Sequence, residues 1–188
     1  MKRTIKTMLG AATRPVRFRR ALGIAAAFIL TASGVVGISL PASATDLAAP
    51  ATCSIQTFNT RNYLTAVDGG GRTTNVIQSN RTAAKSWETF TLVPAGDGVH
   101  VGLRTTNGNF LTAIGGGGRI TDVLASTATV MQGWEMFNII RFGGDGFAIQ
   151  TINGRYLTAV SGGGRTSDVI HSDATQVQAW ELFLFNCR

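Results

Sequence analysis

Three pairs of residues in this sequence place an aromatic ring near a hydrogen-bonding side chain. The aromatic residues are Tyr63, Phe110 and Tyr156, and their polar companions are Asn75, Asp122 and Asp168. A neutral sugar stacks its C–H face on an aromatic ring and donates its hydroxyl hydrogens to an amide or carboxylate. We therefore predict these six residues as ligand-binding residues and a polysaccharide or glycan as the partner. Alternatively, Asp122 and Asp168 only cap a turn by accepting hydrogen bonds from backbone N–H groups.

No residue pattern in the chain predicts catalysis. The two histidines, His100 and His171, fall at non-equivalent places in the repeated segments described below, and nothing marks a nucleophile beside either. No group of His, Cys and Asp has the spacing of zinc ligands. We expect a protein that is not an enzyme and that carries no metal and no cofactor.

Residues 1–44 have the pattern of a secretory signal peptide. Seven Lys and Arg residues precede an apolar run over 21–40, and the small triplet Ala42-Ser43-Ala44 follows. The alternative is a membrane anchor, because the run is about as long as a bilayer requires. The cleavage pattern favours export, by the general or the twin-arginine route. We expect an extracellular protein without a membrane span after cleavage, in which 45–52 is a linker.

The net charge of +7 lies entirely in residues 1–44. Residues 45–188 hold ten basic and ten acidic side chains, so this part of the chain is electrically balanced. Binding to a phosphate backbone requires a surplus of Lys and Arg. We therefore expect no nucleic-acid partner.

Three internal repeats organise the rest of the chain. Tyr-Leu-Thr-Ala-Val, Gly-Gly-Gly-Arg and Trp-Glu-x-Phe each recur with small changes, and the tryptophans are 47 and 46 residues apart. A fixed period of this size indicates a repeated architecture. We place the repeats at about 53–100, 101–146 and 147–188.

Each repeat is predicted to form four short strands. In the third repeat these are 147–152, the Tyr-Leu-Thr-Ala-Val run, 169–172, and a strand that starts at the Trp-Glu-x-Phe motif. Three such units close on themselves when six strands form a barrel and six form hairpins that cap one end. Closure removes the exposed strand edges that promote aggregation. The predicted fold class is all-β, with pseudo-threefold symmetry.

The two cysteines support this closure. Cys53 opens the first repeat and Cys187 is the penultimate residue of the chain. Disulfides form in oxidising compartments, and a closed barrel makes the first and last strands neighbours. We predict a Cys53–Cys187 disulfide, with two free thiols or an intermolecular bond as alternatives.

Strand alternation predicts which side chains face the core. The repeated Leu and Ala of the second strand and the Phe of the fourth face inward, and we expect the Trp residues to pack as well. Tyr63, Thr65 and their equivalents then face outward. The Glu of each Trp-Glu-x-Phe motif shares the parity of the Phe, so we predict a structural pairing with the repeated arginines. These structural residues are Arg72, Glu88, Arg119, Glu135, Arg165 and Glu181.

A Tyr-Leu-x-Ala strand, a Gly-rich turn and a Trp-Glu-x-Phe strand, present three times, resemble the fascin-like branch of the β-trefoil fold. The resemblance covers about 53–187 and implies a β-trefoil. Two repeats also carry the Gln-x-Trp letters of the ricin-type lectins, at Gln132 and Gln178, whereas Lys85 replaces Gln in the first repeat. Trefoils serve many functions, so the resemblance implies no single one.

Our main functional hypothesis is a secreted, non-catalytic, carbohydrate-binding module with three weak sites. The alternative is a secreted protease inhibitor or another protein-binding trefoil. Such a protein would use a loop that breaks the symmetry, and the most divergent loops are Pro94–His100 and Arg141–Gly146.

Overall fold

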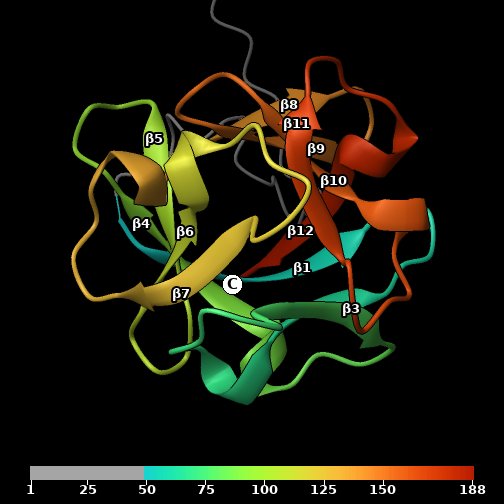
Figure 1. Ribbon diagram of the computed structural model, residues 1–188, viewed down its shortest axis with the longest axis horizontal. Helices are drawn as coiled ribbons and strands as arrows, with labels where there is room; N and C mark the ends of the chain where they lie inside the picture. Colours follow the sequence, from blue (N-terminus) through green and yellow to red (C-terminus); the bar gives the residue numbers. More distant parts are fainter. Residues whose placement is uncertain (1–48) are drawn as a thin grey trace, which may run out of the picture. The chain divides into compact units, whose positions relative to one another are not determined.

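The computed structural model describes residues 49–188. The predicted signal peptide and most of the predicted linker lie outside these residues. The described part is built from β-strands and short 3-10 turns (Figure 1). Within 49–188, no helix is long and apolar enough to cross a membrane.

The four strands of each repeat follow one another in the predicted order. The first repeat comprises β1 (Ala51–Thr57), β2 (Tyr63–Ala66), β3 (Ile77–Arg81) and β4 (Thr89–Pro94). The second comprises β5 (His100–Arg104), β6 (Phe110–Ala113), β7 (Leu124–Ala128) and β8 (Met136–Phe142). The third comprises β9 (Gly146–Thr151), β10 (Tyr156–Ala159), β11 (Ile170–Ala174) and β12 (Leu182–Cys187).

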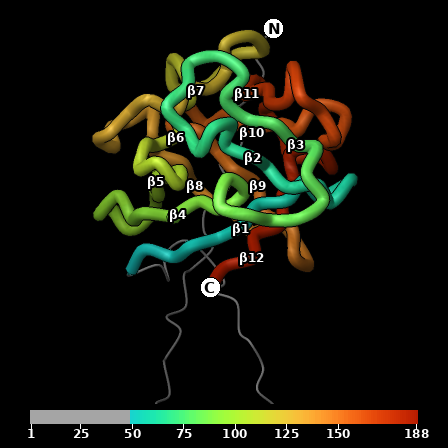
Figure 2. The backbone as a smooth tube through the Cα atoms, turned by 90° about the horizontal axis from the view of Figure 1, so that it is seen from below, coloured from blue at the N-terminus to red at the C-terminus, as the bar shows by residue number. Residues whose placement is uncertain are grey.

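Six of the strands close into an antiparallel barrel. β1 pairs with β4, β4 with β5, β5 with β8, β8 with β9, β9 with β12, and β12 returns to β1. The hairpins β2–β3, β6–β7 and β10–β11 lie together toward one end of this barrel (Figure 2). This arrangement is a β-trefoil, so the predicted fold class is confirmed.

A disulfide joins the first strand of the barrel to the last. Cys53 and Cys187 are bonded, and they are direct partners in the register of β1 with β12. Figure 2 shows the C-terminal strand β12 next to β1. The bond therefore locks the seam at which the barrel closes.

The barrel interior is filled by the repeated apolar side chains that alternation predicted. Phe90, Phe137 and Phe183 are fully buried, and the Leu and Ala of each second strand join them in one core. Burying a large apolar side chain stabilises the fold by about 1.5–3 kcal/mol. The hydrophobic core thus spans all three repeats.

The second strand of each repeat departs from simple alternation. Thr65 and Thr112 were expected to face outward, yet both are buried, and Thr158 is half-buried. The register between β2 and β3 shifts after Tyr63, and β6 and β10 show the same irregularity. Such a shift breaks the regular in-and-out pattern of a strand. A 3-10 turn of the same repeat also contacts this strand and covers it.

Hydrogen bonds between repeats run in a ring around the pseudo-threefold axis. The backbone N–H of Arg72 donates to the Ser126 hydroxyl (3.0 Å), and the N–H of Ser126 donates back to the Arg72 carbonyl (2.8 Å). The same exchange joins Arg119 to Ser172 and Arg165 to Ser79. All three serines are fully buried. Each repeat is therefore bonded to the next, and the third returns to the first.

The Gly-rich turns bring neighbouring repeats into close contact. Gly117 has a φ of 103° and lies so close to Thr151 of the next repeat that a Cβ would overlap the threonine side chain. The next glycine, Gly118, also has a positive φ (89°), but a Cβ there would meet nothing within 4 Å. Only the first of the two is needed for packing between repeats.

We predict that Gly117→Ala destabilises the protein more than Gly118→Ala. Both substitutions place a Cβ at a positive φ, which costs on the order of 1–3 kcal/mol. Gly117→Ala adds an overlap with Thr151, worth roughly another 1–3 kcal/mol. The measurement is the free energy of unfolding in a denaturant titration. Equal losses for the two variants would contradict the close contact.

We also predict that reduction of the disulfide lowers the free energy of unfolding. The bond closes a loop with a sequence separation of 134 residues. In the chain-entropy description, a loop of this length contributes on the order of 4–5 kcal/mol. Denaturant titrations with and without a thiol reductant measure the difference. A Cys53→Ser/Cys187→Ser variant, which should not respond to the reductant, is the control, and an unchanged midpoint on reduction of the original protein would refute the prediction.

Candidate functional site

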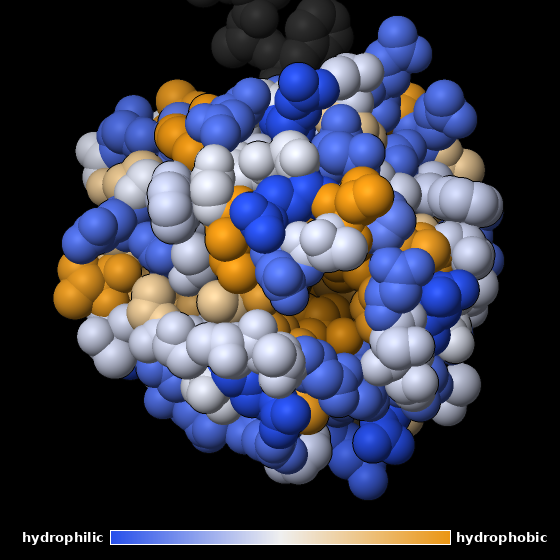
Figure 3. All heavy atoms as spheres, viewed as in Figure 1, coloured by the Kyte–Doolittle hydropathy of each residue, from blue (hydrophilic) through white to orange (hydrophobic). Residues whose placement is uncertain are grey.

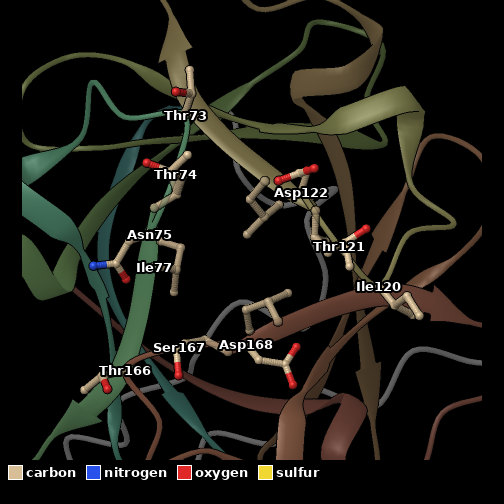
Figure 4. Close-up of a pocket in the computed structure, with 15 residues that line it drawn as sticks. Thr73, Thr74, Asn75, Ile77, Ile120, Thr121, Asp122, Thr166, Ser167 and Asp168 are labelled. Atoms are coloured by element: carbon tan, nitrogen blue, oxygen red, sulfur yellow. The ribbon is translucent and has the colours of Figure 1, made fainter.

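The predicted polar ligand residues converge at one end of the barrel. Asn75, Asp122 and Asp168 line a pocket of about 520 Å³ on the pseudo-threefold axis. We call it the axial pocket; its lining is Thr73–Ile77, Ile120–Leu124 and Thr166–Ile170. The space-filling view shows a hollow with an apolar floor (Figure 3), and the close-up shows the rim residues of the three loops around one opening (Figure 4).

The loops around the axial pocket are held by their own backbone and by arginine. Asn75, Asp122 and Asp168 all have left-handed backbone, with φ of 46–49°. Asn and Asp tolerate this conformation better than most residues. The Arg72 Nε donates to the Thr74 carbonyl (3.1 Å), and Arg119 and Arg165 make the same contact in their repeats.

The polar rim residues do not serve as caps of the Gly-rich turn. No hydrogen bond from a backbone N–H to the carboxylate of Asp122 or Asp168 is present within residues 49–188. Asp168 instead contacts His171 Nε2 (2.8 Å) and Arg165 Nη2 (3.5 Å). These two side chains therefore stand at the rim for another reason than turn capping.

The predicted aromatic residues lie away from these polar partners. Tyr63 pairs with Arg81 in the hairpin, whereas Ala66 pairs with Ile77, near Asn75. Three residues of strand separate Tyr63 from Ala66, which is about 10 Å. The predicted combination of ring and polar group is therefore not assembled, because the hairpin holds the two at opposite ends.

Phe110 also differs from the expectation of an outward ring. It is buried, and a Cβ added at Gly102 would overlap both the Phe110 ring and the Met131 sulfur. The missing side chain at Gly102 thus makes room for the Phe110 ring. Tyr63 and Tyr156 are half-buried.

The tryptophans are the aromatic residues that are exposed at the equivalent position of all three repeats. Trp87, Trp134 and Trp180 are 42%, 52% and 47% exposed, so the expected burial of these side chains is wrong. Two of them line equivalent clefts. The Trp180 cleft, of about 400 Å³, is formed by Ala174, Thr175, Gln176, Gln178, Ala179, Trp180 and Glu181. The Trp87 cleft, of about 460 Å³, is formed by Arg81, Thr82, Ala83, Lys85, Ser86, Trp87 and Glu88.

A buried glutamate holds each tryptophan at the surface. Trp180 lies in the 3-10 turn η7 (Ala179–Glu181), between a buried Glu181 and an exposed Ala179. Glu181 accepts hydrogen bonds from the Thr158 hydroxyl (2.7 Å) and from the backbone N–H of Gln178 (2.8 Å). The turn η3 (Ser86–Glu88) has the same two bonds from Thr65 and Lys85, and η5 (Gly133–Glu135) from Thr112 and Gln132. Because Glu anchors the turn inward, its neighbour Trp faces solvent.

These bonds correct the predicted pairing of arginine with glutamate. Each glutamate is satisfied by a threonine hydroxyl and a backbone N–H, which are neutral donors. The repeated arginines hold the ring of bonds between repeats through their backbone, and the Arg72 side chain pairs with Asp68. A buried carboxylate needs hydrogen-bond donors, and threonine supplies one from the strand beneath.

The two clefts combine a flat aromatic surface with hydrogen-bonding groups. This combination suits a small ligand ring that has one apolar face and polar substituents. An indole provides a flat stacking surface, and the Gln176 and Gln178 amides beside Trp180 donate and accept hydrogen bonds. Tyr156 is the direct strand partner of Ala174, and Tyr63 of Arg81, so each tyrosine adjoins the cleft of its repeat. The axial pocket has a floor of Val, Ile and Leu and contains no aromatic ring.

The divergent loop after β4 is ordered by an aspartate. The backbone N–H of His100 and its imidazole, together with the N–H of Val99, hold the pKa of Asp97 well below its usual range. The Asp97 carboxylate lies 2.6 Å from His100 Nδ1. This contact closes the loop on itself. Within residues 49–188, no group of three or more His, Cys, Asp or Glu is arranged to hold a metal ion.

Several solved structures have the same fold. The Rhizoctonia solani agglutinin superposes with a TM-score of 0.62 at 18% identity, over 81% of this chain and 100% of the agglutinin. The designed threefold-symmetric protein ThreeFoil gives 0.61 at 8%, over 71% and 96% of the two chains. SeviL, solved with the asialo-GM1 saccharide, gives 0.54 at 10%, over 73% and 98%. At these identities the similarity establishes the fold alone.

We predict that Trp134→Ala costs far less stability than Phe137→Ala in the same motif. Phe137 is fully buried, and its truncation should cost about 3–5 kcal/mol. Trp134 is half exposed, so its truncation should cost at most about 2 kcal/mol. Denaturant unfolding of both variants measures the two losses. A loss for Trp134→Ala as large as that for Phe137→Ala would mean that the tryptophan is a packing residue after all.

The family assignment rests on the sequence itself. No curated protein matches the chain. The profile of one family matches residues 45–185, which is most of the chain and nearly all of the part that forms the trefoil. That family is described as a domain of unknown function, DUF7910. This protein therefore belongs to the DUF7910 family and has a β-trefoil fold.

Proposed function

We propose that this protein is a secreted, non-catalytic, carbohydrate-binding module, and that the clefts beside the exposed tryptophans are its sugar sites. The observation that carries this proposal is the repeated indole at the surface, 42–52% exposed in all three repeats. An exposed indole offers a flat apolar face, and the C–H face of a pyranose ring stacks on such a surface. The positive head and cleavage pattern of residues 1–44 support secretion.

The geometry of the clefts favours a saccharide over other small molecules. The Trp180 cleft is shallow and polar around its ring, with two amides, a threonine hydroxyl and a tyrosine at its edge. Sugars offer many hydroxyls and one apolar face, which matches this mixture. Two proteins with the same fold support this class of ligand. One is the Rhizoctonia solani agglutinin, and the other is SeviL, which was solved bound to the asialo-GM1 saccharide. We do not propose actin binding from the resemblance to the fascin-like branch.

Repeated tryptophans around one axis favour polymeric ligands: Trp87 and Trp180 each line a cleft, and Trp134 is exposed at the equivalent position. Each site is small and open, so a single sugar should bind weakly. A polysaccharide that reaches more than one of these tryptophans gains affinity through effective concentration. Gln132 and Gln178 stand at equivalent positions of the second and third repeats, two residues before Trp134 and Trp180.

We predict that the purified protein binds glycans on an array and is retained by an insoluble polysaccharide. Trp180→Ala should weaken the binding of a polysaccharide by roughly tenfold or more, since it removes one stacking surface and part of the avidity. Replacing all three tryptophans by alanine should abolish retention. The matched control is Phe142→Ala, which removes an aromatic side chain that is 38% exposed but lies outside the clefts.

A second variant locates the site. Asp122→Ala/Asp168→Ala removes both carboxylates from the rim of the axial pocket. Loss of binding in this variant, with binding intact in the tryptophan variants, would move the sugar site to the axial pocket. Absence of binding to any glycan would remove the proposal, and a titration against secreted proteases would then test the protein-binding alternative.

A further inference from the structure

The clefts of the first and third repeats are formed by equivalent residues but differ in charge. The Trp87 cleft is lined by Arg81 and Lys85, and the corresponding positions of the Trp180 cleft hold Ala174 and Gln178. The second repeat has Ala128 and Gln132 there. The only cations at these two positions are therefore those of the first repeat.

The residue that precedes each of these positions increases the contrast. Asn80 precedes Arg81, whereas the exposed Asp173 precedes Ala174. Both clefts contain a glutamate, Glu88 or Glu181, but each is buried and already accepts two hydrogen bonds. The Trp87 cleft therefore has two basic side chains in its lining, whereas the Trp180 cleft has none and has a carboxylate, that of Asp173, on a neighbouring residue.

The two cations are not used to hold the fold. Among residues 49–188, neither Arg81 nor Lys85 forms a salt bridge, and both are exposed. The backbone of Lys85 serves the turn: its N–H donates to the Glu88 carboxylate (2.8 Å), and its carbonyl accepts a hydrogen bond from the Glu88 N–H (3.2 Å). Their charged ends are thus available beside the exposed ring of Trp87. A guanidinium offers a planar fork of donors that matches a carboxylate, and an ammonium adds a second, flexible donor.

We propose that the Trp87 cleft selects an acidic saccharide, a uronic acid unit whose ring stacks on Trp87 and whose carboxylate meets Arg81 and Lys85. The Trp180 cleft takes the neutral counterpart, because its amides offer hydrogen bonds without charge and Asp173 repels an anion. This inference rests on the proposed function. Together the clefts would recognise a polysaccharide that contains both neutral and acidic units.

The three tryptophans of the chain allow each cleft to be observed alone. Trp134→Phe/Trp180→Phe leaves Trp87 as the single tryptophan, and Trp87→Phe/Trp134→Phe leaves Trp180. Indole fluorescence then reports the binding to one cleft in each variant. The probes are trigalacturonic acid and the C6-oxidised form of cellotriose, each beside its methyl ester, which removes the charge and keeps the stereochemistry.

The Trp87 variant should bind at least one acid about five- to tenfold more tightly than its ester, as expected for exposed but charge-assisted contacts. The preference should disappear on adding Lys85→Gln and Arg81→Gln, and at 1 M salt, where the Debye length is about 3 Å. The Trp180 variant should prefer the esters. Lys85→Gln matches the residue that the other two repeats already carry, so the fold should tolerate it.

Several outcomes would overturn the inference. Equal binding of acid and ester to the Trp87 variant would refute charge selection and leave the proposed function standing. Equally tight binding of inorganic sulfate would show a simple anion site rather than a saccharide site, and tighter binding of a 6-O-sulfated cellotriose would replace the uronic acid by a sulfated sugar. No binding of any probe to the Trp87 variant would also refute the inference, and the glycan array separately decides whether the proposed function fails with it.

Discussion

The exchange of hydrogen bonds between a Gly-Arg turn and a buried serine in the next repeat is the constraint on which this structure depends. Arg72 bonds to Ser126, Arg119 to Ser172, and Arg165 back to Ser79. A buried backbone N–H or carbonyl without a partner is costly, so no repeat satisfies its own turn alone. The three repeats must therefore fold as one unit. The disulfide between β1 and β12 adds a covalent link between the first repeat and the third.

The joining of three similar repeats also explains why an exposed tryptophan turn occurs three times on the surface. Each turn that carries a tryptophan is anchored by a buried glutamate to the threonine of its own second strand. Each second strand pairs with the third strand of its repeat, and the serine of that third strand is hydrogen-bonded to the neighbouring repeat. The tryptophans are thus displayed by rigid elements, and a rigid, exposed ring loses little conformational entropy when a ligand stacks on it.

Within this symmetric frame, the differences between repeats become informative. Positions that join one repeat to the next, such as Ser79, Ser126 and Ser172, are the same in all three repeats. Positions around the tryptophans are not, and Lys85 stands where the others have glutamine. The fold requires the same residue at each of the serine positions. It tolerates different residues around the tryptophans, because exposed cleft residues contribute little to folding. The clefts can therefore differ in charge without disturbing the scaffold.

Much of the fold was predictable from the sequence. The period of the Trp-Glu-x-Phe and Gly-Gly-Gly-Arg motifs determined the number of units, the all-β class and the closed trefoil. The terminal positions of Cys53 and Cys187 indicated the disulfide. The Leu of the second strand and the Phe of the fourth were placed in the core by alternation. Such features depend on residue type and local periodicity, and both can be read directly from a single sequence.

The candidate site was less predictable, because it depends on contacts between strands. A register shift after Tyr63 and the covering turn η3 turned Thr65 inward, and Gly102 admitted the ring of Phe110 to the interior. The parity of Glu88 with Phe90 suggested an inward carboxylate, but its partner proved to be the Thr65 hydroxyl and not an arginine. Sequence alone determined what repeats in this protein. Tertiary structure decided which repeated side chain reaches the solvent, since the glutamate bonds that turn Trp87, Trp134 and Trp180 outward form only when the second strand lies beneath them.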